Sequence, residues 1–266
     1  MNLLKSMLPS LCVFGGLLGI YGCATTPPLP EAYSAKFTPR FSAGEIQKDS
    51  PAHITFALVE PGYQRGYIHS YRSQSLGNGR TQWLMSPEEH PTSKLFRDSL
   101  KKELEALMIS KGFRVAGPYN NLNEMTFPQK KQADLTLQPV ITFVLEAPQL
   151  NCHAVTSLAG AMLGLQNDSS ECEASGSCAI QGRVDFEVLE PLTAQKMWTK
   201  SVNIDSASED CSAKSPDGYK AVYDNAVAKL LDGAYNATIG KIDTYFNREE
   251  MELVKQQSLE LRPKSQ

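Results

Sequence analysis

The chain has 266 residues, of which 26 are lysine or arginine and 29 are aspartate or glutamate, giving a formal net charge of −3 at pH 7. This balance excludes the general basic surface with which proteins bind nucleic acid or anionic lipid. Hydrophobic residues make up 41% of the chain, which is ordinary for a globular protein and excludes disorder over most of its length.

Residues 1–22 are predicted to be a lipoprotein signal peptide. Lys5 carries a positive charge, and the apolar stretch that follows it is shorter than the roughly 20 residues of a membrane-spanning helix. This stretch ends in Ile20-Tyr21-Gly22-Cys23, which resembles a bacterial lipobox. We therefore expect Cys23 to become the acylated N-terminus of the mature chain. The alternative is an ordinary secretory signal that is cleaved elsewhere and leaves Cys23 as a thiol.

An acylated Cys23 would anchor the protein in a membrane. Acyl chains such as palmitate contribute about 0.8 kcal/mol per buried methylene group, so an anchor of two or more chains is effectively permanent. Ala24 resembles the residue that sorts such lipoproteins to the outer membrane. The expected location is therefore the outer membrane, with lipid as the first partner and with the body on either the surface or the periplasmic side.

Three regions are expected after the signal peptide. Residues 23–51 contain five prolines and no periodic pattern, which predicts a semi-extended tether. A single globular domain is predicted over residues 52–247. Residues 248–266 are predicted to continue the last helix as a charged, solvated extension.

The first half of the domain is predicted to contain a strand, a helix and a second strand. Residues 53–59 alternate and are rich in β-branched side chains, as strands are. A helix is expected from Thr92 or Ser93 to Lys111, because apolar residues recur along one face and Gly112 follows at the position of a C-terminal cap. Residues 113–116 are predicted to be a short strand.

The second half is predicted to contain three strands and a long helix. Residues 134–145 form the first strand, and residues 179–189 and 196–204 form a hairpin. A helix is predicted over residues 219–246. The expected fold class is α/β (α+β), with a mixed, largely antiparallel sheet of about five strands flanked by two main helices.

Four cysteines belong to the expected body, and they are Cys152, Cys172, Cys178 and Cys211. An even number in an oxidising compartment predicts two disulfides, whereas a four-cysteine zinc site is the alternative. No C-x-x-C pair of the usual structural zinc site is present, so no metal is expected. The predicted hairpin brings Cys178 and Cys211 to one end of the sheet, and an antiparallel pairing of 134–145 with 179–189 would bring Cys152 and Cys172 to the same end. The favoured pairing is therefore 152–172 with 178–211.

Catalytic motifs are absent from the sequence. The four histidines do not have metal-ligand spacing, and neither a G-x-S-x-G elbow nor a phosphate-binding loop is found. We therefore expect no catalytic residues, no cofactor and no enzymatic activity.

Two segments are candidates for binding. Tyr63, Arg65, Tyr67 and Tyr71 occupy alternate positions and would share one face of an extended segment, where they could contact a sugar or a protein. The alternative is that the tyrosines pack on the body and the arginines are solvated. The apolar segment 154–166 is either a contact patch for a partner or membrane, or a short helix on the edge of the sheet.

Four segments carry a resemblance to a known family, and they are 93–115, 125–145, 182–205 and 221–246. Their most specific pieces are Phe127-Pro128-Gln129-Lys130-Lys131 before a strand and Phe186-Glu187-Val188-Leu189-Glu190-Pro191 at the hairpin. In order and spacing they resemble the neuraminyllactose-binding haemagglutinin family of bacterial surface lipoproteins. The resemblance implies an envelope or flagellar-sheath lipoprotein, non-enzymatic and adhesin-like, with a mixed sheet flanked by helices.

One departure from that family limits what the resemblance implies. The family's proposed sialic-acid motif is a basic Lys-Arg-Thr-Ile-Gln-Lys-like stretch after the strand at 134–145, but residues 147–152 contain no basic residue. Binding of sialyl-lactose is therefore not expected. Two functions remain, namely adhesin-like binding of a host or surface ligand (a glycan or a protein) and an accessory role in an envelope machine such as a flagellar sheath, motor or secretion apparatus.

Overall fold

The structure is a computed structural model that describes residues 30–41, 53–64, 74–75, 80–84, 91–148, 150–155 and 169–262. The predicted signal peptide, Cys23, Arg65, Tyr67 and Tyr71 lie outside these residues, as does most of the apolar segment 154–166. Among the described residues, no helix combines the length and the apolar character needed to cross a lipid bilayer.

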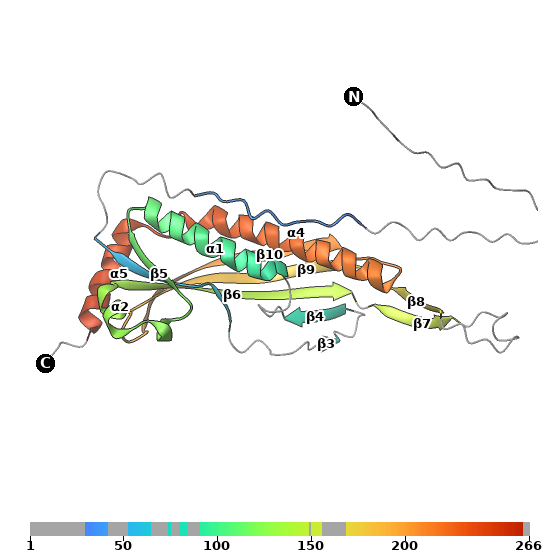
Figure 1. Ribbon diagram of the computed structural model, residues 1–266, viewed down its shortest axis with the longest axis horizontal. Helices are drawn as coiled ribbons and strands as arrows, with labels where there is room; N and C mark the ends of the chain where they lie inside the picture. Colours follow the sequence, from blue (N-terminus) through green and yellow to red (C-terminus); the bar gives the residue numbers. More distant parts are fainter. Residues whose placement is uncertain are drawn as a thin grey trace, which may run out of the picture.

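A mixed sheet runs along the body (Figure 1). The main path through it is β10–β9–β6–β1–β5, formed by Lys196–Asp210, Ser177–Leu189, Leu135–Pro148, Thr55–Val59 and Arg114–Tyr119. Strand β1 runs parallel to β5 and β6, whereas β6, β9 and β10 are antiparallel neighbours. Three short strands join this path: β2 (Gly62–Tyr63) and β4 (Arg80–Leu84) pair with β6, and β3 (Gln74–Ser75) pairs with β4. The predicted fold class is confirmed.

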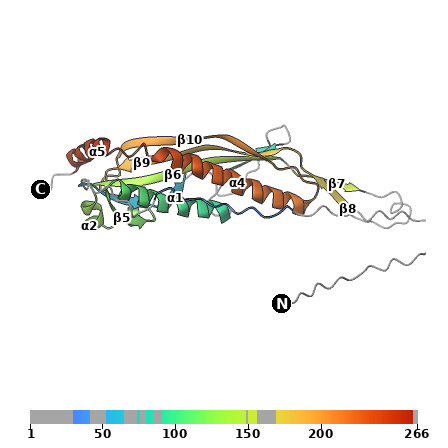
Figure 2. The same cartoon turned by 90° about the horizontal axis from the view of Figure 1, so that it is seen from above.

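Two long helices cover one side of the sheet (Figures 1 and 2). Helix α1 spans Pro91–Ser110 and α4 spans Pro216–Ile242. Gly112 has a φ of 83°, a left-handed conformation that ends α1 and that glycine adopts at little cost. The ring of Phe96 on α1 lies 5.4 Å from that of Phe143 on β6, so the predicted apolar stripe of α1 faces the sheet.

The connection from β5 to β6 crosses the opposite side of the sheet. It contains a short 3-10 turn (Leu122–Glu124) and helix α2 (Phe127–Gln132). Met125 and Ala133 of this connection pack on Ala57 of β1. The β1–α1–β5 and β5–β6 crossovers run across the sheet in opposite directions, so right-handed connections place them on opposite sides of it. The β1 region is therefore covered on both sides.

The C-terminal residues form a separate helix, α5 (Arg248–Leu261), rather than a solvated continuation of α4. The side chain of Asn247 accepts a hydrogen bond from the Glu249 N–H and caps the new helix. Met251 and Val254 are buried in the main core. The predicted helical character is confirmed, but the helix is packed on the core rather than solvated, because Met251 and Val254 give it a buried side among charged residues.

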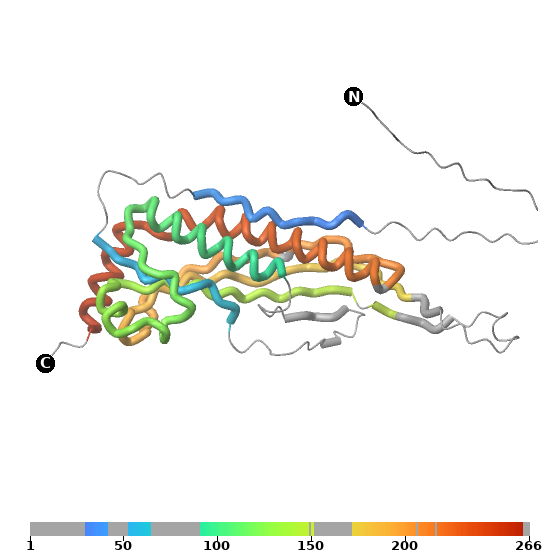
Figure 3. Tube along the Cα trace, in the orientation of Figure 1, coloured from blue at the N-terminus to red at the C-terminus, as the bar shows by residue number. Residues whose placement is uncertain are grey.

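The proline-rich region also differs from the prediction where the structure describes it. Residues 30–41, which we call the strap, extend along α1 and α4 (Figure 3). Phe37 of the strap is buried in the main core. This part of the predicted tether therefore belongs to the folded body.

Candidate functional surfaces

The side of β6, β9 and β10 that faces away from α1 and α4 carries no helix among the described elements. Successive side chains of a strand point to opposite faces of the sheet, and directly opposed residues in antiparallel strands share a face. The side chains of β6, β9 and β10 can therefore be assigned to the helix side or to the opposite side. Ile141 of β6 lies opposite Val184 of β9, and Val184 lies opposite Val202 of β10, all three on the helix side. The intervening residues form what we call the polar sheet face: Gln138, Val140, Thr142, Val144, Gln181, Arg183, Asp185, Glu187, Thr199, Ser201 and Asn203.

Asp185 organises the centre of the polar sheet face. Its carboxylate accepts hydrogen bonds from Arg183 Nε at 2.9 Å and from Ser201 Oγ at 2.5 Å, and the residue is only 8% exposed. At the β6 edge, Thr142 Oγ1 donates to Gln64 Oε1 at 2.9 Å. The face thus presents ordered hydrogen-bond donors and acceptors, with the charge of Arg183 matched by its neighbour. Such a surface suits an uncharged polar ligand.

Tyr63 is the one predicted ligand-binding residue that the structure describes, and it is engaged with the body. It lies on β2 opposite Ile141 and packs against the main core. Its hydroxyl donates a hydrogen bond to the carbonyl oxygen of Ser93 at 3.3 Å. Burial raises the pKa of Tyr63 to about 12. Tyr63 is therefore a packing residue rather than part of a stacking platform for a sugar.

The raised pKa of Tyr63 makes stability depend on alkaline pH. A tyrosine in the unfolded chain ionises near its usual pKa of about 10, so the unfolded state releases this proton first as the pH rises. The stabilisation that comes from keeping Tyr63 protonated in the folded state is complete below pH 10 and is lost between about pH 10 and 12. We expect Tyr63→Phe to reduce the loss of unfolding free energy between pH 9 and 11.5 by up to about 2 kcal/mol. Urea unfolding at a series of pH values measures this.

Tyr235 provides the comparison for that measurement. Burial and the neighbouring Glu103 raise the pKa of Tyr235 as well, so the Tyr63→Phe protein should keep part of its alkaline sensitivity. Identical pH profiles for the wild-type and Tyr63→Phe proteins would show that Tyr63 ionises normally in the folded state.

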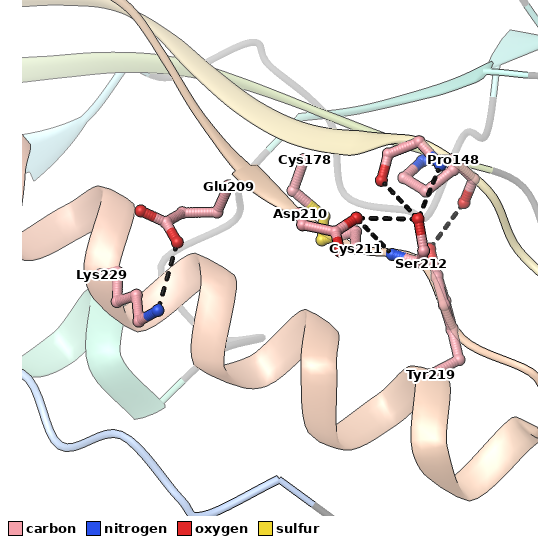
Figure 4. The surroundings of a disulfide bond; sticks show 9 residues. Pro148, Cys178, Glu209, Asp210, Cys211, Ser212, Tyr219 and Lys229 are labelled. Atoms are coloured by element: carbon pink, nitrogen blue, oxygen red, sulfur yellow. Dashed lines mark hydrogen bonds and ion pairs between the residues drawn. A yellow bond between two sulfur atoms is a disulfide. The ribbon is translucent and has the colours of Figure 1, made fainter.

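A disulfide between Cys178 and Cys211 closes one end of the sheet (Figure 4). Cys178 lies near the start of β9 and Cys211 directly follows β10, and both side chains are fully buried. Next to the bridge, Ser212 donates hydrogen bonds to Asp210 from its N–H and its hydroxyl, and these bonds lower the pKa of that carboxyl. The predicted 178–211 pairing is confirmed.

The other two cysteines lie beyond this end of the sheet. Strands β7 (Asn151–Val155) and β8 (Ser169–Glu173) form a separate two-stranded sheet that projects from the body (Figure 1). Cys152 and Cys172 are directly opposed in its register, and Cys172 is disulfide-bonded. We call this part of the molecule, with β7, β8 and the Cys178–Cys211 bridge, the hairpin end. It is named for β7 and β8 and lies at the opposite end of the sheet from the turn between β9 and β10.

The described residues contain no cluster of three or more histidine, cysteine, aspartate or glutamate side chains that could hold a metal ion. The two buried glutamates have structural partners. Glu190 accepts hydrogen bonds from the N–H groups of Leu192 and Thr193 in the β9–β10 turn, and Glu103 accepts from strap N–H groups.

Comparison with known proteins gives a distant relation. No protein-family model and no curated protein matches the sequence. Among solved structures, the chain is similar to one described as a neuraminyllactose-binding hemagglutinin homolog from Helicobacter pylori, with a TM-score of 0.53 and 17% identity over 86% of this chain and 100% of that chain. A DUF330 protein from Xanthomonas campestris matches with a TM-score of 0.25 and 11% identity, over 79% of this chain and 97% of that chain. The likeness to the Helicobacter pylori protein is a relation at the level of the fold.

Proposed function

We propose that this protein is a lipid-anchored, non-catalytic binding protein of the bacterial outer membrane, and that its polar sheet face contacts the ligand. The observation that carries the proposal is the difference between the two sides of the sheet. Helices α1 and α4 cover one side, while polar side chains of β9 and β10, together with Gln138 and Thr142 of β6, line most of the other. The lipobox-like sequence at Cys23 supports the anchor, and the fold shared with a hemagglutinin homolog supports a binding role.

The proposed ligand is an uncharged glycan or a polar protein surface on a host or a neighbouring cell. Sialic acid carries a carboxylate, which is best held by a free, bidentate arginine. Arg183 donates its Nε–H to Asp185, whose carboxylate offsets the positive charge of the guanidinium, and residues 147–152 contain no basic residue. Binding should therefore not prefer sialylated over desialylated glycans.

The test compares two double variants on a glycan array and on immobilised host-surface proteins. Gln181→Ala/Asn203→Ala removes two exposed amides from the polar sheet face, whereas Gln256→Ala/Asn236→Ala removes two exposed amides from α5 and α4. Two lost hydrogen bonds of about 0.5–1.5 kcal/mol each should weaken binding about 5- to 150-fold in the first protein. The second protein should bind as the wild type does.

Two results would contradict the proposal. Equal binding by both double variants would show that the ligand contacts another surface. Strong, salt-sensitive selectivity for sialylated glycans would show that a cationic site exists. If no ligand binds and the protein co-purifies with flagellar or secretion components, the accessory role in an envelope machine replaces the adhesin-like role.

A further inference from the structure

The strap is bound through its backbone by side chains of both long helices. On α1, the buried Glu103 accepts hydrogen bonds from the N–H groups of Arg40 at 2.5 Å and Phe41 at 2.8 Å. On α4, Asp232 accepts from the N–H of Phe37 at 3.0 Å. Hydrogen bonds to charged acceptors are stronger than those between neutral groups. The two carboxylates therefore hold the strap at its middle and at its C-terminal end.

An aromatic residue fixes the register of the strap. Phe37 is 5% exposed, and its ring lies 5.2 Å from that of Tyr235 and 5.9 Å from that of Phe96. Its backbone has a φ of 40°, which residues with a side chain rarely adopt. The surrounding packing must compensate for this conformation. The strap is therefore an integral part of the fold and is held at one defined position on the body.

The contacts also define the direction of the strap. Near its N-terminal end, the Tyr33 N–H donates to Asn225 Oδ1 at 2.7 Å, and Asn225 Nδ2 donates to the carbonyl oxygen of Glu31 at 2.8 Å. Asn225 belongs to the first half of α4, and the start of α4 adjoins the hairpin end, where Tyr219 Oη donates to the carbonyl oxygen of Pro148 at 2.6 Å. The strap thus enters the body near the hairpin end (Figure 3).

The length of chain before the strap limits where a lipid on Cys23 can lie. Six residues separate Cys23 from Pro30, and seven extended steps span at most about 25 Å. The last 17 residues of α4, after Asn225, extend about 25 Å away from this entry point, and α5 lies beyond them. Helix α5 and the hairpin end lie at opposite ends of the body in both views (Figures 1 and 2).

We propose that the docked strap orients the body on the membrane, with the hairpin end toward the lipid surface and α5 away from it. This inference rests on the proposed acylation of Cys23. The bound strap removes 12 residues from the tether, so the anchor reaches the lipid from the hairpin end and not from the α5 end. In this orientation the strands run outward from the membrane surface, and the polar sheet face remains accessible along its length.

Energy transfer to labelled lipid tests the orientation. The acylated protein is placed in phosphatidylethanolamine–phosphatidylglycerol vesicles that contain an acceptor lipid. A donor dye is attached to an azide-bearing residue that replaces exposed Glu173 at the hairpin end or, in a second protein, exposed Gln256 on α5. Because the two sites differ in height by at least about 25 Å, transfer from position 173 should exceed transfer from position 256 about twofold or more.

Two further proteins test the role of the strap. Phe37→Ala/Glu103→Gln should release the strap, keep vesicle binding and remove the difference between the two donor positions. A flexible insertion of about 20 residues between residues 24 and 30 should also keep vesicle binding and remove the difference between the two donor positions, while the strap stays docked and every contact of the body is intact. The insertion keeps the test decisive if the substitutions disturb folding.

The outcomes separate the orientation from the anchor. Equal transfer from both positions in an acylated, vesicle-bound protein would overturn the orientation and leave the anchor standing. Greater transfer from position 256 would do the same. A protein that is not acylated and does not bind vesicles would overturn both proposals.

Discussion

Gly182→Ala is expected to destabilise the protein by about 2–6 kcal/mol, which would prevent folding if the total stability is at the lower end of the usual range. Gly182 lies on β9 opposite Phe143 of β6 and has a φ of 151°. A Cβ atom at this position would lie 1.9 Å from the carbonyl oxygen of Thr142. That oxygen belongs to the backbone of a central strand, so it cannot move without disturbing the pairing of β6 and β9.

Gly233→Ala is the matched control. Gly233 lies within α4, and nothing is found within 4 Å of the place where a Cβ atom would be added. Alanine favours a helix over glycine by about 0.5–1 kcal/mol, so this variant should be as stable as the wild type or slightly more stable. Urea unfolding followed by circular dichroism measures both. Equal unfolding midpoints for the two variants would show that β9 does not approach β6 as described.

Removal of the Cys178–Cys211 bridge is expected to have the second-largest effect. The bridge joins residues 33 positions apart, and a loop of this length gives about 3–4 kcal/mol of stabilisation through restriction of the unfolded chain, in the entropic account. Cys178→Ala/Cys211→Ala should therefore lower the free energy of unfolding by about that amount. Peptide mapping under non-reducing conditions should recover the two cysteines in one cross-linked species from the wild type.

Reductant provides the control for the bridge. It should lower the unfolding midpoint of the wild type more than that of the double alanine variant, which has already lost this cross-link. Unchanged stability in the double variant would contradict the predicted role of the bridge. Free thiols at both positions in protein taken from the envelope would contradict the bridge itself.

Local signals in the sequence predicted the two long helices, α1 and α4, and the five strands on the main path of the sheet. The apolar stripe of α1 and its terminating Gly112 defined that helix, because both depend on residues within a few turns of one another. The β9–β10 hairpin was also predictable, and its observed register pairs Leu189 with Lys196. That register placed Cys178 near residue 207, at the same end of the sheet as Cys211, and two irregularities in β10 bring it opposite Glu209, two residues from Cys211. Each of these features is set by short-range geometry.

The strap and α5 were not predictable because their contacts come from distant residues. The strap depends on Glu103 and Asp232, which in the sequence are ordinary acidic residues of amphipathic helices. Proline-rich segments without periodicity usually form spacers, and nothing local marks Phe37 as a core residue. In α5, only Met251 and Val254 indicate a buried side, which is too short a pattern to separate from a solvated helix.

The sequence pattern of the polar sheet face predicted a strand but did not show that its polar side is left uncovered by helices. Gln181, Arg183, Asp185 and Glu187 alternate with apolar residues, and this pattern predicted a strand. The same pattern occurs in strands whose polar side is covered by another element. Which side of β9 is covered depends on where α1, α4 and the β5–β6 connection cross the sheet, and those crossings are set by long-range contacts.

The mass of the N-terminal peptide, measured on protein purified from the cell envelope, is the most direct test of the proposal that the protein is lipid-anchored. The mature chain is expected to begin at Cys23, and this residue is expected to carry acyl chains. Cys23→Ser should then leave an unprocessed or released protein that no longer fractionates with the outer membrane. An unmodified peptide that continues through Cys23 from residues before it, in protein still found in the outer membrane, would contradict the account.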